Sequence, residues 1–236
     1  MAERAARVRE QVQAASRAAG RPADAVAVLA VAKGHPLEAV HELFQLGFRD
    51  FGENRVQEAV AKYGAPGSQP AWVQAIRLHL IGHLQSNKVK LARDYFQLIQ
   101  TVDRTSLVAQ LARDPGHPRP IMVQVNVGRE AQKQGVWPED LLAFLGELGP
   151  QPGVLVVGLM AVLPRVGEPW RGRAMEEAHT VWQAVRREGW PWVPCDRLSM
   201  GMSEDFEAAI QHGSTEVRIG TALFGARPAE RPPRDT

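Results

Sequence analysis

The chain has 236 residues, 44% of them apolar, so it can bury a full core as one α/β barrel or as two ordinary domains. With 28 basic and 26 acidic side chains, the formal net charge is only +2, which argues against nucleic acid or an anionic membrane as the main partner. The one cysteine, Cys195, excludes an internal disulfide and a thiol-based structural zinc site, and we expect no metal site.

The amino-terminal stretch MAERAARVRE mixes both signs of charge and lacks an apolar segment of signal-peptide length. The longest apolar runs, residues 25–32 and 154–163, are too short to span a bilayer. These features predict a soluble cytoplasmic protein.

The first segment has the period of a helix. Val8, Val12, Ala15 and Ala19 follow one another at steps of four, three and four residues, and Gly20-Arg21-Pro22 then ends the pattern. We expect a helix here, before the main fold begins.

Short apolar runs then alternate with segments of helical period. The runs are residues 25–32, 48–52, 77–82, 96–102, 120–127, 154–160, 197–200 and 216–224. Repeated strand-helix-strand units predict a parallel sheet, and consecutive apolar residues are typical of strands covered on both faces. This pattern favours a single (β/α)₈ TIM barrel with an extra N-terminal helix, and an open doubly wound sheet is the alternative. We expect one domain over residues 1–227 and a loose, proline-rich tail over 228–236.

The functional residues of such a barrel lie at the carboxyl ends of its strands. Lys33 ends the first run, and the last two runs read LSMGMSED and EVRIGTALFG. Barrels often hold a phosphate with the loops after strands seven and eight. Gly201 permits close approach of a ligand, Ser203 fits the N-cap of the next helix, and Gly220-Thr221 repeats this pairing of bare backbone and hydroxyl.

Each of these residues also has a structural interpretation. Ser203 followed by acidic residues is an ordinary helix start, and Gly220 can simply relieve packing. His79, between two leucines, fits a hydrogen-bonded core histidine better than a catalyst, and Lys33 alone fits a solvated strand end. The combination of a strand-end lysine with a phosphate cup favours a phosphorylated aldehyde held as a Schiff base, and Arg218 is a candidate cation to lower the lysine's pKa.

Six motifs occur in order along the chain: AVAKGHP, FGENRVQE, HLIGHLQSNK, GLMAVLP, LSMGMSEDFEAAI and GSTEVRIGTALFG. In order and spacing they resemble the pyridoxal-phosphate homeostasis proteins of the YggS/PROSC type. The resemblance runs from Ala25 to Arg227 and implies a barrel similar to the amino-terminal domain of alanine racemase, with pyridoxal 5′-phosphate (PLP) bound covalently.

The resemblance also implies roles for individual residues. Lys33 matches the lysine that carries PLP as an internal aldimine, and Arg218 matches the arginine facing the pyridine nitrogen. Phosphate contacts are implied for Ser203, Gly220 and Thr221 and for the Met200-Gly201 backbone, and Asn54 is implied to lie beside the cofactor. The sequence departs from the family pattern at Leu80, at His83 and in the QKQG segment of residues 132–135, without losing an implied ligand.

The residue types also bear on whether the protein is an enzyme. An arginine opposite the pyridine nitrogen leaves that nitrogen largely unprotonated, so the ring is a weak electron sink and transamination and decarboxylation are disfavoured. Alanine racemase-like enzymes take a second base, a tyrosine, from a further β-rich domain, for which we expect no room here. Tyr63 and Tyr95 are poorly placed for that role.

The first hypothesis is therefore a PLP carrier of intracellular PLP homeostasis without catalytic residues, with PLP-dependent apo-enzymes as candidate recipients and a monomer as the expected state. The alternative is an enzyme, either a weak amino-acid racemase or a lysine Schiff-base aldolase. A purely structural barrel is the third possibility.

Overall fold

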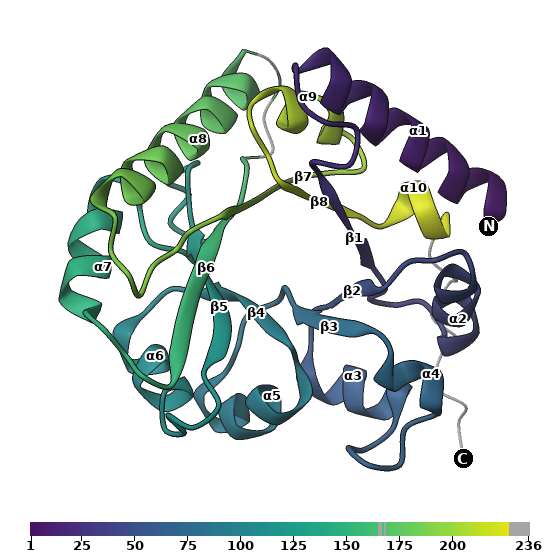
Figure 1. Ribbon diagram of the computed structural model, residues 1–236, viewed down its shortest axis with the longest axis horizontal. Coiled ribbons are helices and arrows are strands. Elements are labelled where there is room, and N and C mark those ends of the chain that lie inside the picture. The colour runs from purple at the N-terminus through teal and green to yellow at the C-terminus, as the bar shows by residue number, and fades with distance from the viewer. Residues whose placement is uncertain (165–166, 168, 227–236) are drawn as a thin grey trace.

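In the computed structural model, eight parallel strands close into a barrel in chain order, with helices on its outside (Figure 1). The last strand pairs with the first, so the sheet has no free edge. The structure describes residues 1–164, 167 and 169–226. It confirms the closed barrel over the open sheet, whereas residue 227 and the tail expected over 228–236 lie outside the described residues.

The strands are β1 (Ala27–Val31), β2 (Asp50–Glu53), β3 (Arg77–Leu80), β4 (Leu98–Val102), β5 (Arg119–Val125), β6 (Val154–Ala161), β7 (Arg197–Met202) and β8 (Glu216–Ile219). The helices are α1 (Ala2–Ala18), α2 (Leu37–Gln45), α3 (Val56–Tyr63), α4 (Ala71–Gln74), α5 (Val89–Tyr95), α6 (Thr105–Leu111), α7 (Leu141–Leu148), α8 (Trp170–Glu188), α9 (Phe206–Gln211) and α10 (Thr221–Phe224). Two short 3₁₀ turns, η1 (Ser86–Lys88) and η2 (Pro138–Asp140), precede α5 and α7.

The expected amino-terminal helix is α1, which packs against α9 and α10 beside the last strands (Figure 1). Val8, Val12 and Ala15 are buried, as their helical spacing predicts. Arg4 adds polar contacts, because its guanidinium donates to the carbonyl oxygens of Leu223 at 2.8 Å and of Phe224 at 3.1 Å. Helix α1 therefore covers the helices that follow β7 and β8.

The last strand differs from its prediction. Residues 216–224 were expected to form one strand, but β8 ends at Ile219 and residues 221–224 form α10. The carbonyl oxygen of Gly220 accepts hydrogen bonds from the N–H groups of Leu223 at 3.0 Å and Phe224 at 2.9 Å, which turns the chain into a helix. A short apolar run has no periodicity that separates a strand from a buried helical turn.

All eight strands contribute buried side chains to one large apolar cluster, and Leu98, Met122 and Met160 form a second, smaller one. Four of the buried polar side chains are exceptions of interest, namely His79, Gln100, Glu216 and Arg218. None of the described helices combines the length and apolar character needed to cross a membrane.

Candidate functional site

Lys33 lies two residues beyond the end of β1, at the carboxyl end of the barrel. Gly34 has φ +74°, in the left-handed region that favours glycine, and the His35 N–H donates to the carbonyl oxygen of Ala32 at 3.1 Å. The His35 ring stacks on Phe224 of α10, with the ring centroids 4.5 Å apart. The loop that carries Lys33 is therefore held against the helix that follows β8.

A buried ion pair supports the same loop from α3. Lys62 Nζ donates to Glu53 Oε1 and to the carbonyl oxygen of Ala32, each at 2.7 Å, and the Tyr63 hydroxyl donates to Glu53 Oε1 at 2.8 Å. Burial raises the pKa of the Glu53 carboxyl, and the nearby Lys62 opposes that rise. Because Ala32 directly precedes Lys33, this pair holds the backbone at the point where Lys33 leaves the strand.

Sequence reasoning missed this pair. An acidic residue inside a strand run is a signal, since a buried carboxylate needs a cation or hydrogen-bond donors. Glu53 ends β2 within the FGEN motif, but its cationic partner lies on the following helix, and the sequence offers several basic candidates.

Two turns meet at the carboxyl ends of β7 and β8. Ser203 Oγ, just beyond β7, accepts hydrogen bonds from the N–H groups of Gly220 and Ala222, each at 3.3 Å. Among the described residues, the N–H groups of Ser203 itself and of Thr221 have no acceptor. The two small-residue turns thus converge at this end of the barrel, as the sequence predicts.

The predicted role of Ser203 as an N-cap is wrong. Helix α9 begins at Phe206, and its N-cap residue is Asp205, whose Oδ1 accepts from the Met202 N–H at 2.6 Å. Strand β7 extends to Met202, two residues further than predicted, so Ser203 falls in the connecting turn and its hydroxyl faces the neighbouring turn.

The glycine at position 201 is required by the backbone. Gly201 has φ +92°, and a Cβ atom there would lie 2.5 Å from Ala209 Cβ. The preceding Met200 is fully buried in β7. The turn that leads to Ser203 therefore needs a residue without a side chain.

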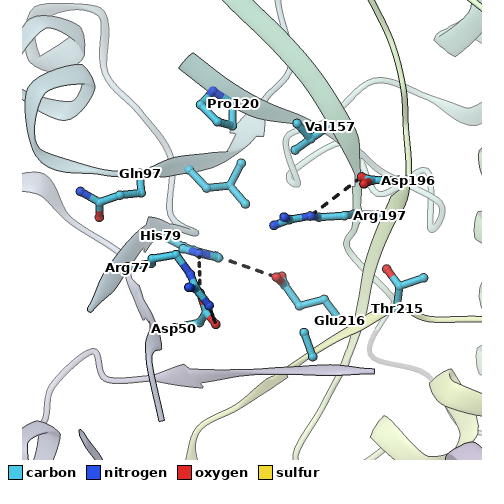
Figure 2. A pocket seen from close by; sticks show the side chains of 12 residues that line it. Asp50, Arg77, His79, Gln97, Pro120, Val157, Asp196, Arg197, Thr215 and Glu216 are labelled. Atoms are coloured by element: carbon cyan, nitrogen blue, oxygen red, sulfur yellow. Dashed lines mark hydrogen bonds and ion pairs between the residues drawn. The ribbon is translucent and has the colours of Figure 1, made fainter. Parts of the chain in front are cut away.

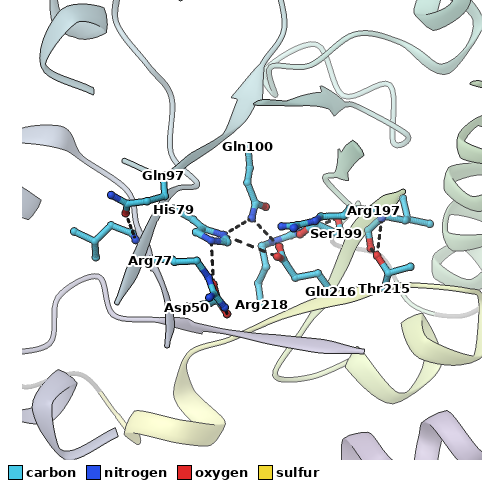
Figure 3. Close-up of polar contacts among 12 residues, drawn as sticks. Asp50, Arg77, His79, Gln97, Gln100, Arg197, Ser199, Thr215, Glu216 and Arg218 are labelled. Atoms are coloured by element: carbon cyan, nitrogen blue, oxygen red, sulfur yellow. Dashed lines mark hydrogen bonds and ion pairs between the residues drawn. The ribbon is translucent and has the colours of Figure 1, made fainter. Parts of the chain in front are cut away.

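Arg218 lies on β8 with its guanidinium buried inside the barrel, next to Ser199 (Figure 3). Nη1 donates to the carbonyl oxygen of Ser199 at 2.8 Å and to its hydroxyl at 3.0 Å, and Nη2 donates to the carbonyl oxygen of Ala161 at 3.0 Å. Burial lowers the pKa of Arg218 from its usual value, yet a guanidinium stays charged in proteins. Backbone carbonyl groups of β6 and β7 and the Ser199 hydroxyl thus hold this cation in place.

Asn54 directly follows β2, and the chain after β3 passes close to its backbone, because a Cβ atom on Gly82 would lie 2.1 Å from the Asn54 carbonyl oxygen. The residues predicted to bind the cofactor all lie at or just beyond the carboxyl ends of four neighbouring strands, β2, β1, β8 and β7. Their individual contacts with a cofactor stay predictions.

A second polar cluster lies at the amino-terminal ends of the strands. His79 Nε2 lies 3.3 Å from Asp50 Oδ1, and the Gln100 amide donates to His79 Nδ1 at 3.0 Å and to Glu216 Oε1 at 2.7 Å (Figure 3). His79 is therefore a hydrogen-bonded core histidine, as its structural interpretation expects. A cavity of about 520 Å³ opens beside this cluster, and none of its lining residues is a predicted cofactor ligand (Figure 2).

Comparison with known proteins identifies close relatives. A model of the family "Alanine racemase, N-terminal domain" matches residues 4–228. Proteins named "Pyridoxal phosphate homeostasis protein" are 41% identical in Pseudomonas aeruginosa, over 96% of this chain and 96% of the relative, and 36% identical in Escherichia coli K12, over 96% of this chain and 97% of the relative.

Solved structures show similarity to the same proteins and to alanine racemase. PipY of Synechococcus elongatus, described with PLP bound, is 34% identical with a TM-score of 0.80 and covers 95% of this chain and 99% of its own. Alanine racemase from Corynebacterium glutamicum, at 14% identity and a TM-score of 0.68 over 94% of this chain and 61% of its own, shares the fold.

Proposed function

Because this chain belongs to the pyridoxal phosphate homeostasis protein family, we propose that it binds pyridoxal 5′-phosphate as a Schiff base on Lys33 and holds it for supply within the cell. The observation that carries the proposal is the placement of a lysine amine and two converging turns at one end of the barrel, in a chain that is 34% identical to a relative described with PLP bound. Residues 1–227 act as one domain in this proposal.

The residues at the carboxyl end fit this cofactor. Acceptor-free N–H groups of Ser203 and Thr221 suit a phosphate, since oriented backbone donors bind anions without a side-chain charge. The unprotonated Lys33 amine would add to the aldehyde carbon, and one water molecule would leave. Bound pyridoxal phosphate supplies a reactive aldehyde and an electron-withdrawing ring.

Arg218 fits the pyridine nitrogen better as a hydrogen-bond donor than as a proton source. Within the described part of the chain, no carboxylate lies within ion-pairing distance of its guanidinium, so no acidic side chain there would keep a ring nitrogen protonated. A ring in that state withdraws electrons weakly, which disfavours catalysis that needs an electron sink.

The tyrosines also favour a carrier over a racemase. The Tyr63 hydroxyl donates to Glu53, and the Tyr95 hydroxyl donates to the carbonyl oxygens of Ala59 at 3.2 Å and Gly64 at 2.8 Å. Both hydroxyls are engaged beside α3, so neither is offered to a substrate as a second base. We therefore propose a monomeric carrier without robust catalysis, with PLP-dependent apo-enzymes as candidate recipients.

The absorbance spectrum of the purified chain tests the Schiff base. We expect a visible band that is fixed by borohydride, with the mass of the adduct mapped to Lys33. Lys33→Ala abolishes the band, whereas Lys90→Ala, which removes an exposed lysine of α5, leaves it unchanged. A colourless protein that gains no band with added pyridoxal phosphate contradicts the proposal.

The enzyme alternative has its own test. Incubation with a panel of amino acids in deuterium oxide should give neither loss of optical activity nor rapid α-deuterium exchange. Robust turnover would replace the carrier with a racemase.

A further inference from the structure

The amino-terminal mouth of the barrel holds a cavity of about 520 Å³, at the opposite end from Lys33 (Figure 2). Cavities of roughly 300–1,000 Å³ are the usual size for small-molecule sites. The charged and titratable side chains that line it come from the first residues of the strands or just before and after them, and are Asp50, Arg77, His79, Asp196, Arg197 and Glu216.

Glu216 is a buried carboxylate in this cavity, with 3% of its surface exposed. Oε1 accepts one hydrogen bond, from the Gln100 amide at 2.7 Å. Oε2 lies 3.9 Å from His79 Nδ1, and no lysine or arginine of the described chain lies within 4.0 Å of it. The same Gln100 amide also contacts His79 Nδ1 at 3.0 Å, so Gln100 lies between the two side chains. The Glu216 carboxylate can therefore accept further hydrogen bonds from a cationic donor.

Arg197 points into the same cavity from the first position of β7 (Figure 2). Its nearest carboxylate oxygen belongs to Asp196, at 3.9 Å from Nε, and that side chain is largely exposed. Gly158 of β6 packs closely on this residue, because a Cβ atom there would lie 2.2 Å from the Arg197 carbonyl oxygen and 2.7 Å from Arg197 Cβ. The backbone that carries this guanidinium is thus fixed in place.

The two charges face one cavity from neighbouring strands without closing on each other. Arg77 and Asp50 in the same cavity show the contrast, since they form a bidentate pair with distances of 2.5 Å and 2.6 Å. No such contact joins Arg197 to Glu216 among the described residues. The Arg197 guanidinium and the Glu216 carboxylate therefore stay apart across the cavity, while Asp50 contacts both Arg77 and His79.

We propose that this cavity binds a small zwitterion of the α-amino-acid class, whose carboxylate accepts from Arg197 and whose ammonium group donates to Glu216. A simple anion would not engage the Glu216 carboxylate, and a simple cation would not engage the Arg197 guanidinium. The site shares no residue with the proposed cofactor site.

Calorimetric titration of the full chain tests this site. Borohydride treatment beforehand fixes any bound aldehyde, so that added amines cannot react with it. We expect amino acids to bind at least about tenfold more tightly than acetate, methylamine or inorganic phosphate, because only a zwitterion engages both charges.

Variants assign the binding to the cavity. Arg197→Gln, at a half-exposed position, and Val157→Phe, which fills the cavity, should each weaken amino-acid binding at least about tenfold. The exposed Arg113→Gln is the matched control and should bind like the unaltered chain.

Three results would overturn the proposal: no heat with any amino acid, equal binding by Arg197→Gln, or phosphate binding as tightly as the amino acids. A failure of the cofactor proposal appears separately, as the absence of the visible band in untreated protein. The two conclusions can therefore fail independently.

Discussion

The two mouths of the barrel present opposite kinds of chemistry. At the carboxyl end, backbone N–H groups, a glycine at φ +92° and one serine hydroxyl form the turns around Lys33 and Arg218. At the amino end, charged side chains line a cavity and partly neutralise one another. The chemistry of the carboxyl end depends on the path of the backbone. The chemistry of the amino end depends on which side chains meet across the barrel.

The largest effect is expected at the support of the Lys33 loop. Lys62→Met would leave the Glu53 carboxyl buried without its cation, which should lower the free energy of unfolding by about 3–5 kcal/mol. The cofactor band should weaken as well, because the carbonyl oxygen of Ala32 loses one of its two donors, and only the His35 N–H stays. Urea unfolding and absorbance measure the two effects.

Lys90→Met, at an exposed position of α5, is the control for Lys62→Met and should change stability little. A loss below about 1 kcal/mol for Lys62→Met would show that the pair behaves like a solvent-screened surface pair.

A substitution in the turn that contains Gly201, at the carboxyl end of the barrel, should lower the free energy of unfolding by nearly as much. Gly201→Ala combines a left-handed φ, at about 1–2 kcal/mol, with a close contact to Ala209, at about 1–3 kcal/mol. We expect a loss of about 2–5 kcal/mol in urea unfolding. Gly146→Ala is the control, because that helical glycine of α7 has open space around its Cβ position, and it should gain about 0.5–1 kcal/mol. Similar losses at both glycines would contradict this account.

The ionised Asp50 carboxylate at the amino-terminal mouth should make the stability of the protein depend on pH. Burial raises the pKa of the Asp50 carboxyl, but hydrogen bonds from His79 and Arg77 outweigh it, and the net pKa lies well below the usual value. A depressed pKa in the folded state contributes stability above the unfolded pKa of about 3.9, and this contribution is lost as the pH falls further.

Asp50→Asn should therefore lower stability by about 1–2 kcal/mol at neutral pH, with the difference shrinking below a pH of about 4. Urea midpoints between neutral and acidic pH measure the trend, and the exposed Asp24→Asn is the control. A difference that stays constant with pH would exclude Asp50 as its source.

The smallest effect is expected at the hydroxyl that joins the two turns. Ser203→Ala removes the acceptor of two hydrogen bonds of 3.3 Å and should cost about 0.5–1.5 kcal/mol, because water can replace part of the loss. The fraction of protein that retains the cofactor through gel filtration should also fall. Ser106→Ala, on the exposed surface of α6, should alter neither property.

Local sequence patterns predicted more of the carboxyl mouth than of the amino mouth. Lys33 and Gly201 lie within short motifs whose strand, turn and glycine content can be interpreted from neighbouring residues. The N-cap assignment of Ser203 was wrong because it depended on where β7 ends, and the sheet sets that point. The continuation of β8 to Phe224 was wrong because packing against α1 and His35 favours a helical turn there.

The polar chain inside the barrel had no local signal. Gln100 and Glu216 are 116 positions apart in the sequence, and their hydrogen bond exists only because the closed sheet brings β4 and β8 to face each other across the interior. Only one prediction from sequence concerned this region, namely that His79 is a hydrogen-bonded core histidine.

The sequence by itself determined the alternation of strands and helices, the closed barrel, the family and the lysine at the end of β1, because these depend on periodicity and contiguous motifs. The tertiary structure alone decided which buried charges pair, that Lys62 supports the Lys33 loop, and that Arg197 and Glu216 face one cavity without pairing with each other. The physical reason is that burial penalises an unpartnered charge, while its partner is chosen by the closure of the sheet and not by distance along the chain.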